Sequence, residues 1–142
     1  MKKQGETGVD RNDHLHVLDL IGETVCDVAD RDSVYFFIAD EISDTGFIMK
    51  TVLSLMDKGC NTFCFYGKYK DIWHRTVKEL FKQSGMDCKN LSSCGSMDDT
   101  VGKAALFLNS GRDIYLLYDI HELCALVTDK IREYECVHDK GA

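Results

Sequence analysis

The sequence predicts an α/β domain in which helices cover both faces of a mainly parallel sheet, and two observations lead to this class. Gly59, Gly85 and Gly111 follow one another at equal intervals, each after a segment with helical periodicity. That interval is close to the length that a strand and its crossover helix need before the next parallel strand begins. Short apolar runs lie between the helical segments, and VYFFIA at residues 34–39 is typical of a strand buried on both faces. We therefore expect a Rossmann-like, three-layer domain with about four mainly parallel strands.

Extended and helical segments alternate along the chain. Residues 15–29 carry apolar side chains at helical spacing and predict a first helix, although their first few residues could instead form a short strand. Apolar and β-branched composition predicts four strands, at residues 34–39, 62–66, 88–92 and 114–118. The third of these is the most polar and is expected at a sheet edge. Capping or acidic residues precede four apolar stripes, so helices are expected to start near Ser43 or Asp44, Asp71, Ser96 and Ile120.

Length and composition narrow the class of protein. The 142 residues suit one domain, expected over residues 14–134, with a disordered tail at 1–13 and a loose tail at 135–142. The net charge of −7 disfavours binding to nucleic acid or to a membrane surface, which both need a basic face. No apolar run is long enough to predict a membrane-spanning helix. The seven cysteines are odd in number and mostly lie in apolar runs, which predicts reduced thiols in the cytoplasm.

Charged side chains follow the expected strands at the edge where open α/β sheets bind ligands. Asp40 and Glu41 follow the first strand and Asp119 follows the fourth, and the three carboxylates could hold one Mg²⁺. Lys68, after the second strand, could then neutralise a phosphate, and His121 could act as an acid or base. This set predicts a divalent-metal-dependent phosphohydrolase or nuclease-like enzyme. The structural interpretation is that Asp40 and Asp119 only cap the helices that follow them.

Three other groups of side chains have both a functional and a structural interpretation. His14 and His16 could hold a metal on an extended segment, or could be a solvated pair beside the tail. Cys60 and Cys64 could be half of a zinc site, but the sequence lacks a second matching pair. On a strand, both thiols would point to the same face, where core packing explains them. Cys94 lies just before a helix start, a position that can lower a thiol pKa, with the histidine after the fourth strand as the candidate base. The glycine signatures of dinucleotide and P-loop sites are absent from the sequence.

Two stretches of the chain carry a family resemblance. Residues 57–80 place Gly-Cys before a strand with a second cysteine, then a glycine and a helix that contains a histidine. Residues 96–111 combine an acidic helix start with a run that ends in Phe-Leu-Asn. In these stretches the chain resembles a family of small bacterial α/β proteins, a domain of unknown function. The resemblance implies a stand-alone accessory protein and supplies no activity. The shared positions that it implies are Gly59, Cys60, Cys64, Gly67, His74, Asp98 and Asp99.

The favoured functional hypothesis follows from the lack of a complete catalytic motif in the sequence. It is a small, non-catalytic binding or adaptor protein of the cytoplasm. The edge strand at residues 88–92 or one helix face could dock a protein partner or a second copy of the chain. No cofactor is expected under this hypothesis. Under the enzymatic alternative, Mg²⁺ would be bound by Asp40, Glu41 and Asp119.

Overall fold

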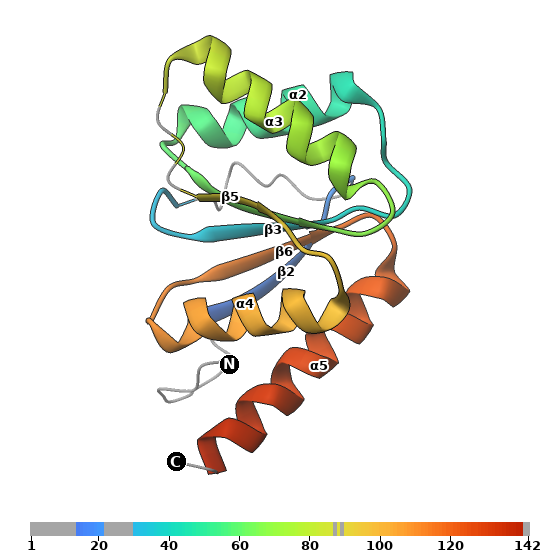
Figure 1. Ribbon diagram of the computed structural model, residues 1–142, viewed down its shortest axis with the longest axis vertical. Helices are drawn as coiled ribbons and strands as arrows, with labels where there is room; N and C mark the ends of the chain where they lie inside the picture. The colour runs from blue at the N-terminus through green and yellow to red at the C-terminus, as the bar shows by residue number, and fades with distance from the viewer. Residues whose placement is uncertain (1–13, 22–29, 87, 89, 141–142) are drawn as a thin grey trace.

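The structure is a computed structural model that describes residues 14–21, 30–86, 88 and 90–140. Within these residues, five strands form one parallel sheet in the order β2-β6-β3-β4-β5 (Figure 1). The strands are β2 (Leu15–Asp19), β3 (Val34–Ile38), β4 (Thr62–Tyr66), β5 (Asn90–Ser93) and β6 (Ile114–Tyr118). The predicted α/β class with a parallel sheet is confirmed, with five strands rather than about four. The tail expected at residues 1–13 falls outside the described residues.

The additional strand is β2, which lies where the sequence predicts the start of a helix over residues 15–29. This part of the prediction is wrong, and the alternative of a short strand is confirmed. β2 pairs with β6 in parallel register, from Leu15 opposite Ile114 to Asp19 opposite Tyr118. A five-residue segment is too short for helical and extended periodicity to be told apart, so the backbone pairing with β6 decides its conformation. Residues 22–29 of the predicted helix lie outside the described residues.

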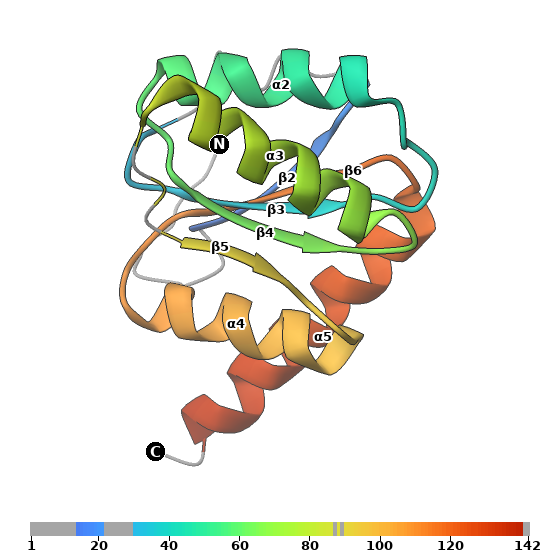
Figure 2. The same cartoon turned by 45° about the horizontal axis from the view of Figure 1, so that its top comes forward.

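Helices cover both faces of the sheet. On one face lie α2 (Thr45–Asp57) and α3 (Lys70–Ser84), and on the other lie α4 (Met97–Asn109) and α5 (His121–Lys140) (Figure 2). Side chains alternate along β3, with Tyr35 and Phe37 packed toward α2 and α3. Phe36 and Ile38 pack toward α4 and α5. The sheet therefore separates two apolar cores, which is the three-layer arrangement that the sequence predicts.

The helix boundaries follow local signals in the sequence. The Asp44 carboxylate accepts a hydrogen bond from the Phe47 N–H at 2.9 Å and caps α2. The Ser96 hydroxyl accepts a hydrogen bond from the Asp99 N–H at 3.1 Å and caps α4. The regularly spaced glycines all have positive φ, as the predicted helix ends require: Gly59 (87°), Gly85 (74°) and Gly111 (84°).

The last helix is longer than the sequence predicts. α5 runs from His121 to Lys140, which corrects the loose tail expected from residue 135 as far as residue 140. Residues 135–140 contain neither glycine nor proline, so the helix can propagate from the packed turns that precede them. None of the described helices is both long and apolar enough to cross a membrane.

The strand order reverses between β3 and β6. From β3 the chain builds outward through β4 to β5 with α2 and α3 on one face, and it then returns through α4 on the other face to β6. β3 and β6 pair in register, with Ile38 opposite Tyr118. The loops that follow these two strands therefore lie side by side at the carboxyl edge of the sheet. Open α/β sheets bind ligands at such a switch point.

Candidate functional site at the carboxyl ends of the strands

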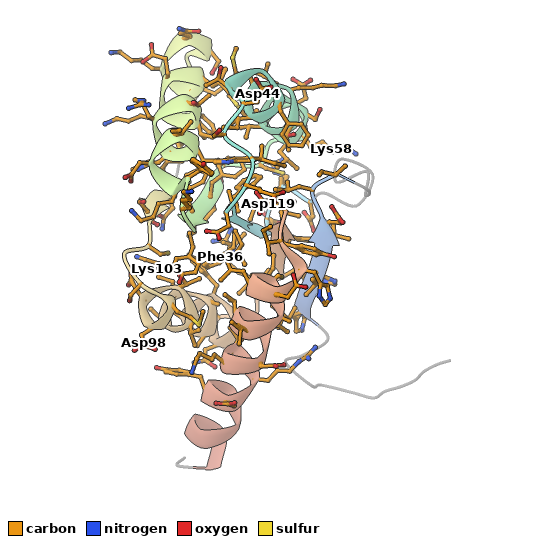
Figure 3. All side chains as sticks on the ribbon, turned by 90° about the vertical axis from the view of Figure 1, so that its right-hand side faces the viewer. Phe36, Asp44, Lys58, Asp98, Lys103 and Asp119 are labelled. Carbon is orange, nitrogen blue, oxygen red and sulfur yellow. The ribbon has the colours of Figure 1, made fainter. Side chains whose placement is uncertain are left out.

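The loops that follow β3 and β6 carry the three predicted acids. Asp40 and Glu41 come after β3, and Asp119 comes directly after β6. Figure 3 shows Asp119 at the junction of β6 and α5. The expectation that these acids meet at one edge of the sheet is confirmed by the parallel pairing of β3 with β6. What the acids do there depends on the contacts of their carboxylates.

The Asp119 carboxylate binds the backbone of the loop after β3. Its Oδ1 accepts a hydrogen bond from the N–H of Asp40 at 2.9 Å. Its Oδ2 accepts hydrogen bonds from the N–H groups of Glu41 at 2.8 Å and of Ile42 at 2.7 Å. We call these three N–H groups the amide nest, because successive backbone amides that converge on one anion form a concave site for oxyanions. Asp119 thereby ties the end of β6 to the end of β3.

Asp40 makes a similar link between β3 and β4. Its Oδ1 accepts a hydrogen bond from the N–H of Lys68 at 2.8 Å. The structural interpretation of Asp40 and Asp119 as caps of the next helix is therefore wrong in its detail, and Asp44 caps α2 instead. Both carboxylates accept hydrogen bonds from backbone N–H groups of a neighbouring loop, which the parallel pairing of the strands places beside them.

The loop after β3 is also held from its other side. The Ala39 N–H donates to the Tyr66 carbonyl at 2.8 Å, and the Ala39 carbonyl accepts from the Tyr69 N–H at 3.0 Å. The Trp73 indole N–H donates to the Ile42 carbonyl at 2.9 Å. These bonds come from β4, from the loop after it and from α3. The shape of the amide nest therefore depends on several elements besides Asp119.

The two remaining members of the predicted set lie against aromatic rings. The Lys68 ammonium is 5.3 Å from the centroid of the Tyr69 ring. The exposed His121 ring and the Tyr118 ring form a T-shaped pair, with 5.8 Å between the centroids. His121 also borders a hollow of about 240 Å³ between β2 and α5. The roles of Lys68 as a phosphate ligand and of His121 as an acid or base stay predictions.

His14 and His16 share a partner that the sequence did not indicate. Asp113 Oδ1 lies 2.9 Å from His14 Nδ1 and 3.3 Å from His16 Nε2. The His16 ring also stacks on Tyr115 at 4.5 Å between centroids. These side chains stand at the amino ends of β2 and β6, at the opposite edge of the sheet from the amide nest. They connect the edge strand to its neighbour, and only the pairing of β2 with β6 brings them together.

Metal binding is one predicted role of the acids at the switch point and of the pair His14 and His16. The part of the chain that the structure describes contains no group of three or more His, Cys, Asp or Glu side chains that could hold a metal ion. At the switch point, both oxygens of Asp119 already accept hydrogen bonds from the amide nest. The structure therefore gives no support to a metal centre at Asp40, Glu41 and Asp119.

The cysteines at the predicted sites are core residues, but the expectation that Cys60 and Cys64 face the same side of a strand is wrong. Cys60 precedes β4 and packs in the core with α2 and α3, whereas Cys64 packs in the core with α4 and α5. Cys94 is fully buried, and burial raises its thiol pKa, which is the opposite of the activation predicted from its position before α4. Burial also raises the pKa of Cys64 to about 12, and its Sγ lies 3.5 Å from the Ser92 Oγ. A neutral thiol is a poor nucleophile, so these geometries do not support nucleophilic catalysis by cysteine.

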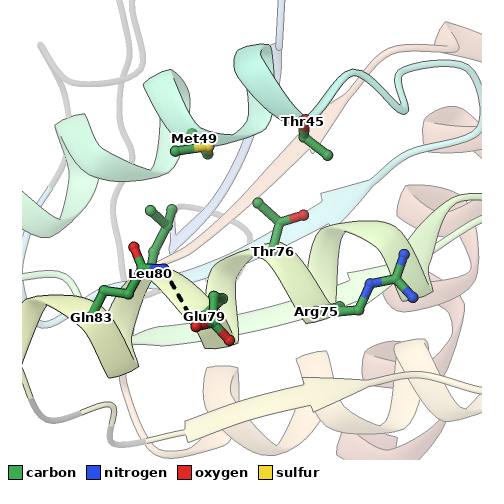
Figure 4. Close-up of a pocket in the computed structure, with 7 residues that line it drawn as sticks. All are labelled: Thr45, Met49, Arg75, Thr76, Glu79, Leu80 and Gln83. Carbon is green, nitrogen blue, oxygen red and sulfur yellow. Dashed lines mark hydrogen bonds between the residues drawn. The ribbon is translucent and has the colours of Figure 1, made fainter.

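A groove lies between α2 and α3, and no motif in the sequence marks it. The groove encloses about 370 Å³ and is lined by Thr45, Met49, Arg75, Thr76, Glu79, Leu80 and Gln83 (Figure 4). We call it the α2–α3 groove. Met49 is 40% exposed, and Leu53, one turn further along the same face of α2, is 41% exposed. The signal in the sequence was the presence of apolar residues on α2 outside its buried stripe.

Comparison with known proteins identifies no relative of this chain. No family model, curated protein or solved structure matches this chain. The resemblance to a family of small bacterial α/β proteins accordingly stays a prediction. Two features of the described residues bear on function: the amide nest that Asp119 fills and the α2–α3 groove.

Proposed function

We propose that this chain is a non-catalytic binding protein of the cytoplasm that engages a protein partner through the α2–α3 groove. The observation that carries the proposal is the pair of exposed apolar side chains, Met49 and Leu53, on the helix that borders the hollow. The buried Leu80 contributes an apolar wall to the same hollow. Single exposed apolar side chains are ordinary on a protein surface, whereas a cluster that borders a hollow is typical of an interaction site.

The polar rim of the groove indicates the chemistry of the partner. Arg75, Glu79 and Gln83 follow one another at four-residue intervals along α3, and the Gln83 side-chain amide donates to the Glu79 carboxylate at 3.4 Å. An apolar hollow with charges of both signs along one wall fits an amphipathic helix. Its apolar face would fill the hollow, and its polar flanks would pair with the rim. Covering the exposed parts of Met49 and Leu53 would contribute about 1 kcal/mol for each side chain.

The contacts of the predicted catalytic set support a non-catalytic role. The Asp119 carboxylate accepts three backbone hydrogen bonds and the Asp40 carboxylate accepts one, which explains both acids by structure. The cysteines among the described residues are all free, which supports a reducing compartment such as the cytoplasm. These observations favour the binding function over metal-dependent hydrolysis.

The test compares two leucines on opposite faces of the molecule. Leu53→Asp places a charge on α2, one helical turn after Met49, which lines the groove. Leu106→Asp places the same charge on α4, where Leu106 is 71% exposed. We expect the wild type and Leu106→Asp to capture the same partner from an extract of the cells that produce the protein. Leu53→Asp should lose affinity for that partner by about tenfold or more. Sedimentation equilibrium of each protein shows whether the partner is a second copy of the chain.

Thermal unfolding provides the control for folding. Both leucines are exposed positions within helices, and Asp is a poorer helix former than Leu, so each substitution should lower the free energy of unfolding by about 1 kcal/mol and leave the protein folded. Equal capture by all three proteins would contradict docking at the α2–α3 groove. Loss of the partner in Leu106→Asp alone would move the docking surface to the opposite face.

A further inference from the structure

The amide nest at the switch point has the geometry of an anion-binding site. The N–H groups of Asp40, Glu41 and Ile42 converge on one carboxylate with N···O distances of 2.9, 2.8 and 2.7 Å. Asp119 is only partly buried, so the side chain that fills the nest is itself accessible to solvent. Hydrogen bonds from backbone amides to an ionised oxygen are among the strong ones in proteins, and they solvate the charge with fixed dipoles.

Contacts that do not involve Asp119 hold the nest in shape. The Ala39 N–H and carbonyl pair with Tyr66 and Tyr69, and the Ile42 carbonyl accepts from the Trp73 indole. Trp73 is fully buried, so this last bond is anchored in the core. Removal of the Asp119 carboxylate should therefore leave three convergent N–H groups around a space of carboxylate size.

We propose that the amide nest is a binding site for a small oxyanion, a carboxylate or a phosphate, and that Asp119 occupies this site in cis. The nest lies where the strand order reverses, which is where ligands bind in open α/β sheets. The oxyanion of an incoming ligand has to displace Asp119, whose attachment to β6 gives it a high effective concentration. The carboxylates of Asp40 and Glu41 add further negative charge beside the nest. The site is consequently closed to free anions until the Asp119 side chain leaves it.

The test is chemical rescue of Asp119→Ala by small anions. The variant should unfold at a lower temperature than the wild type, because three N–H groups lose their acceptor. Acetate, titrated against chloride at constant ionic strength, should raise the unfolding midpoint of the variant in a saturable way. The wild-type midpoint should show no saturable change. Inorganic phosphate forms the second arm, and the anion that binds at the lower concentration identifies the oxyanion that the nest prefers.

Asp44→Ala is the matched control. The Asp44 carboxylate also accepts a backbone hydrogen bond, from the Phe47 N–H at 2.9 Å, but only one and at an exposed helix end. This variant should lose stability and should respond much less to acetate, since a single N–H does not enclose an anion. Equal responses of Asp119→Ala, Asp44→Ala and the wild type would be general salt stabilisation and would overturn the proposal.

If Asp119→Ala does not fold in chloride, two further measurements test the proposal. Refolding in acetate tests the rescue directly, and a fold recovered in acetate and not in chloride supports the proposal. Asp119→Asn keeps the size of the side chain and removes its charge, so phosphate should shift the amide resonances of residues 40–42 in this variant. Lack of that shift, together with failure of acetate to rescue Asp119→Ala, overturns the proposal.

Discussion

Gly67 shows how one residue allows two loops of the candidate site to meet. Its φ of 115° lies in a region that other residues rarely adopt, and a Cβ at this position would lie 2.4 Å from the Ala39 carbonyl oxygen. The obstacle is backbone, which cannot rotate away as a flexible side chain can. The close approach lets the Lys68 and Tyr69 N–H groups reach the loop after β3. Glycine at this position therefore serves the site as well as ending β4.

We expect Gly67→Ala to lower the free energy of unfolding by about 3 kcal/mol or more, because backbone strain and steric overlap act together. Gly85→Ala is the control, since Gly85 also has a positive φ, 74°, but an added Cβ would meet nothing within 4 Å. Strain alone should cost that variant about 1 kcal/mol. Urea unfolding followed by circular dichroism measures both. Equal losses would show that the contact with Ala39 does not matter.

At the scale of the element, α5 shows how far helical periodicity predicts packing. Apolar residues at helical spacing indicate one buried face, and Cys124, Val127 and Ile131 are buried as the spacing predicts. All three belong to the core between this helix, α4 and the sheet. Leu126 falls outside the stripe and is 54% exposed. The burial of each aliphatic side chain thus follows from its angular position on the helix.

Two substitutions within α5 test this assignment. Ile131→Ala should lower the free energy of unfolding by about 2–5 kcal/mol, because it removes buried methylene groups and leaves a cavity. Leu126→Ala removes a side chain of the same size from the surface, and it should change stability by less than about 0.5 kcal/mol. Thermal unfolding of the two variants gives the comparison. Similar losses at both positions would mean that the exposed face of α5 is covered in solution.

At the scale of the whole molecule, the strand order concentrates burial at the centre of the sheet. β3 lies between β6 and β4, and all five of its residues are buried. β2 and β5 form the two edges, and most of their residues are partly or fully exposed. An edge strand pairs on one side only, so it can open without disrupting the strands at the centre.

Hydrogen exchange should distinguish the central strands of the sheet from its two edge strands. We expect the slowest amide exchange in β3, β6 and β4, and faster exchange in β2 and β5, because local opening of an edge requires less free energy than global unfolding. Exchange followed by mass spectrometry at neutral pH resolves the five strands as separate peptides. Protection of β2 equal to that of β3 would contradict the expectation and would indicate that another part of the molecule covers this edge.

The sequence by itself determined the α/β class, four of the strands and the starts of the helices. These features rest on local signals: the period of apolar residues, the caps Asp44 and Ser96, and the glycines at helix ends. It also placed Asp40 and Asp119 at one edge of the sheet, because the carboxyl ends of parallel strands share an edge. Local signals of this kind act over a few residues and can be read without knowing the rest of the chain.

Only the tertiary structure decided the conformation of β2, the partner of His14 and His16, and the role of Asp119. The Asp119 carboxylate accepts hydrogen bonds from amides that lie 77 to 79 residues earlier in the chain. Every residue other than proline has a backbone N–H, so an amide nest leaves no pattern in the sequence. Whether an aspartate at a strand end caps its own helix or binds a neighbouring loop depends on which loops meet in space. Strand order and register determine which loops lie side by side, and local sequence patterns do not specify either of them.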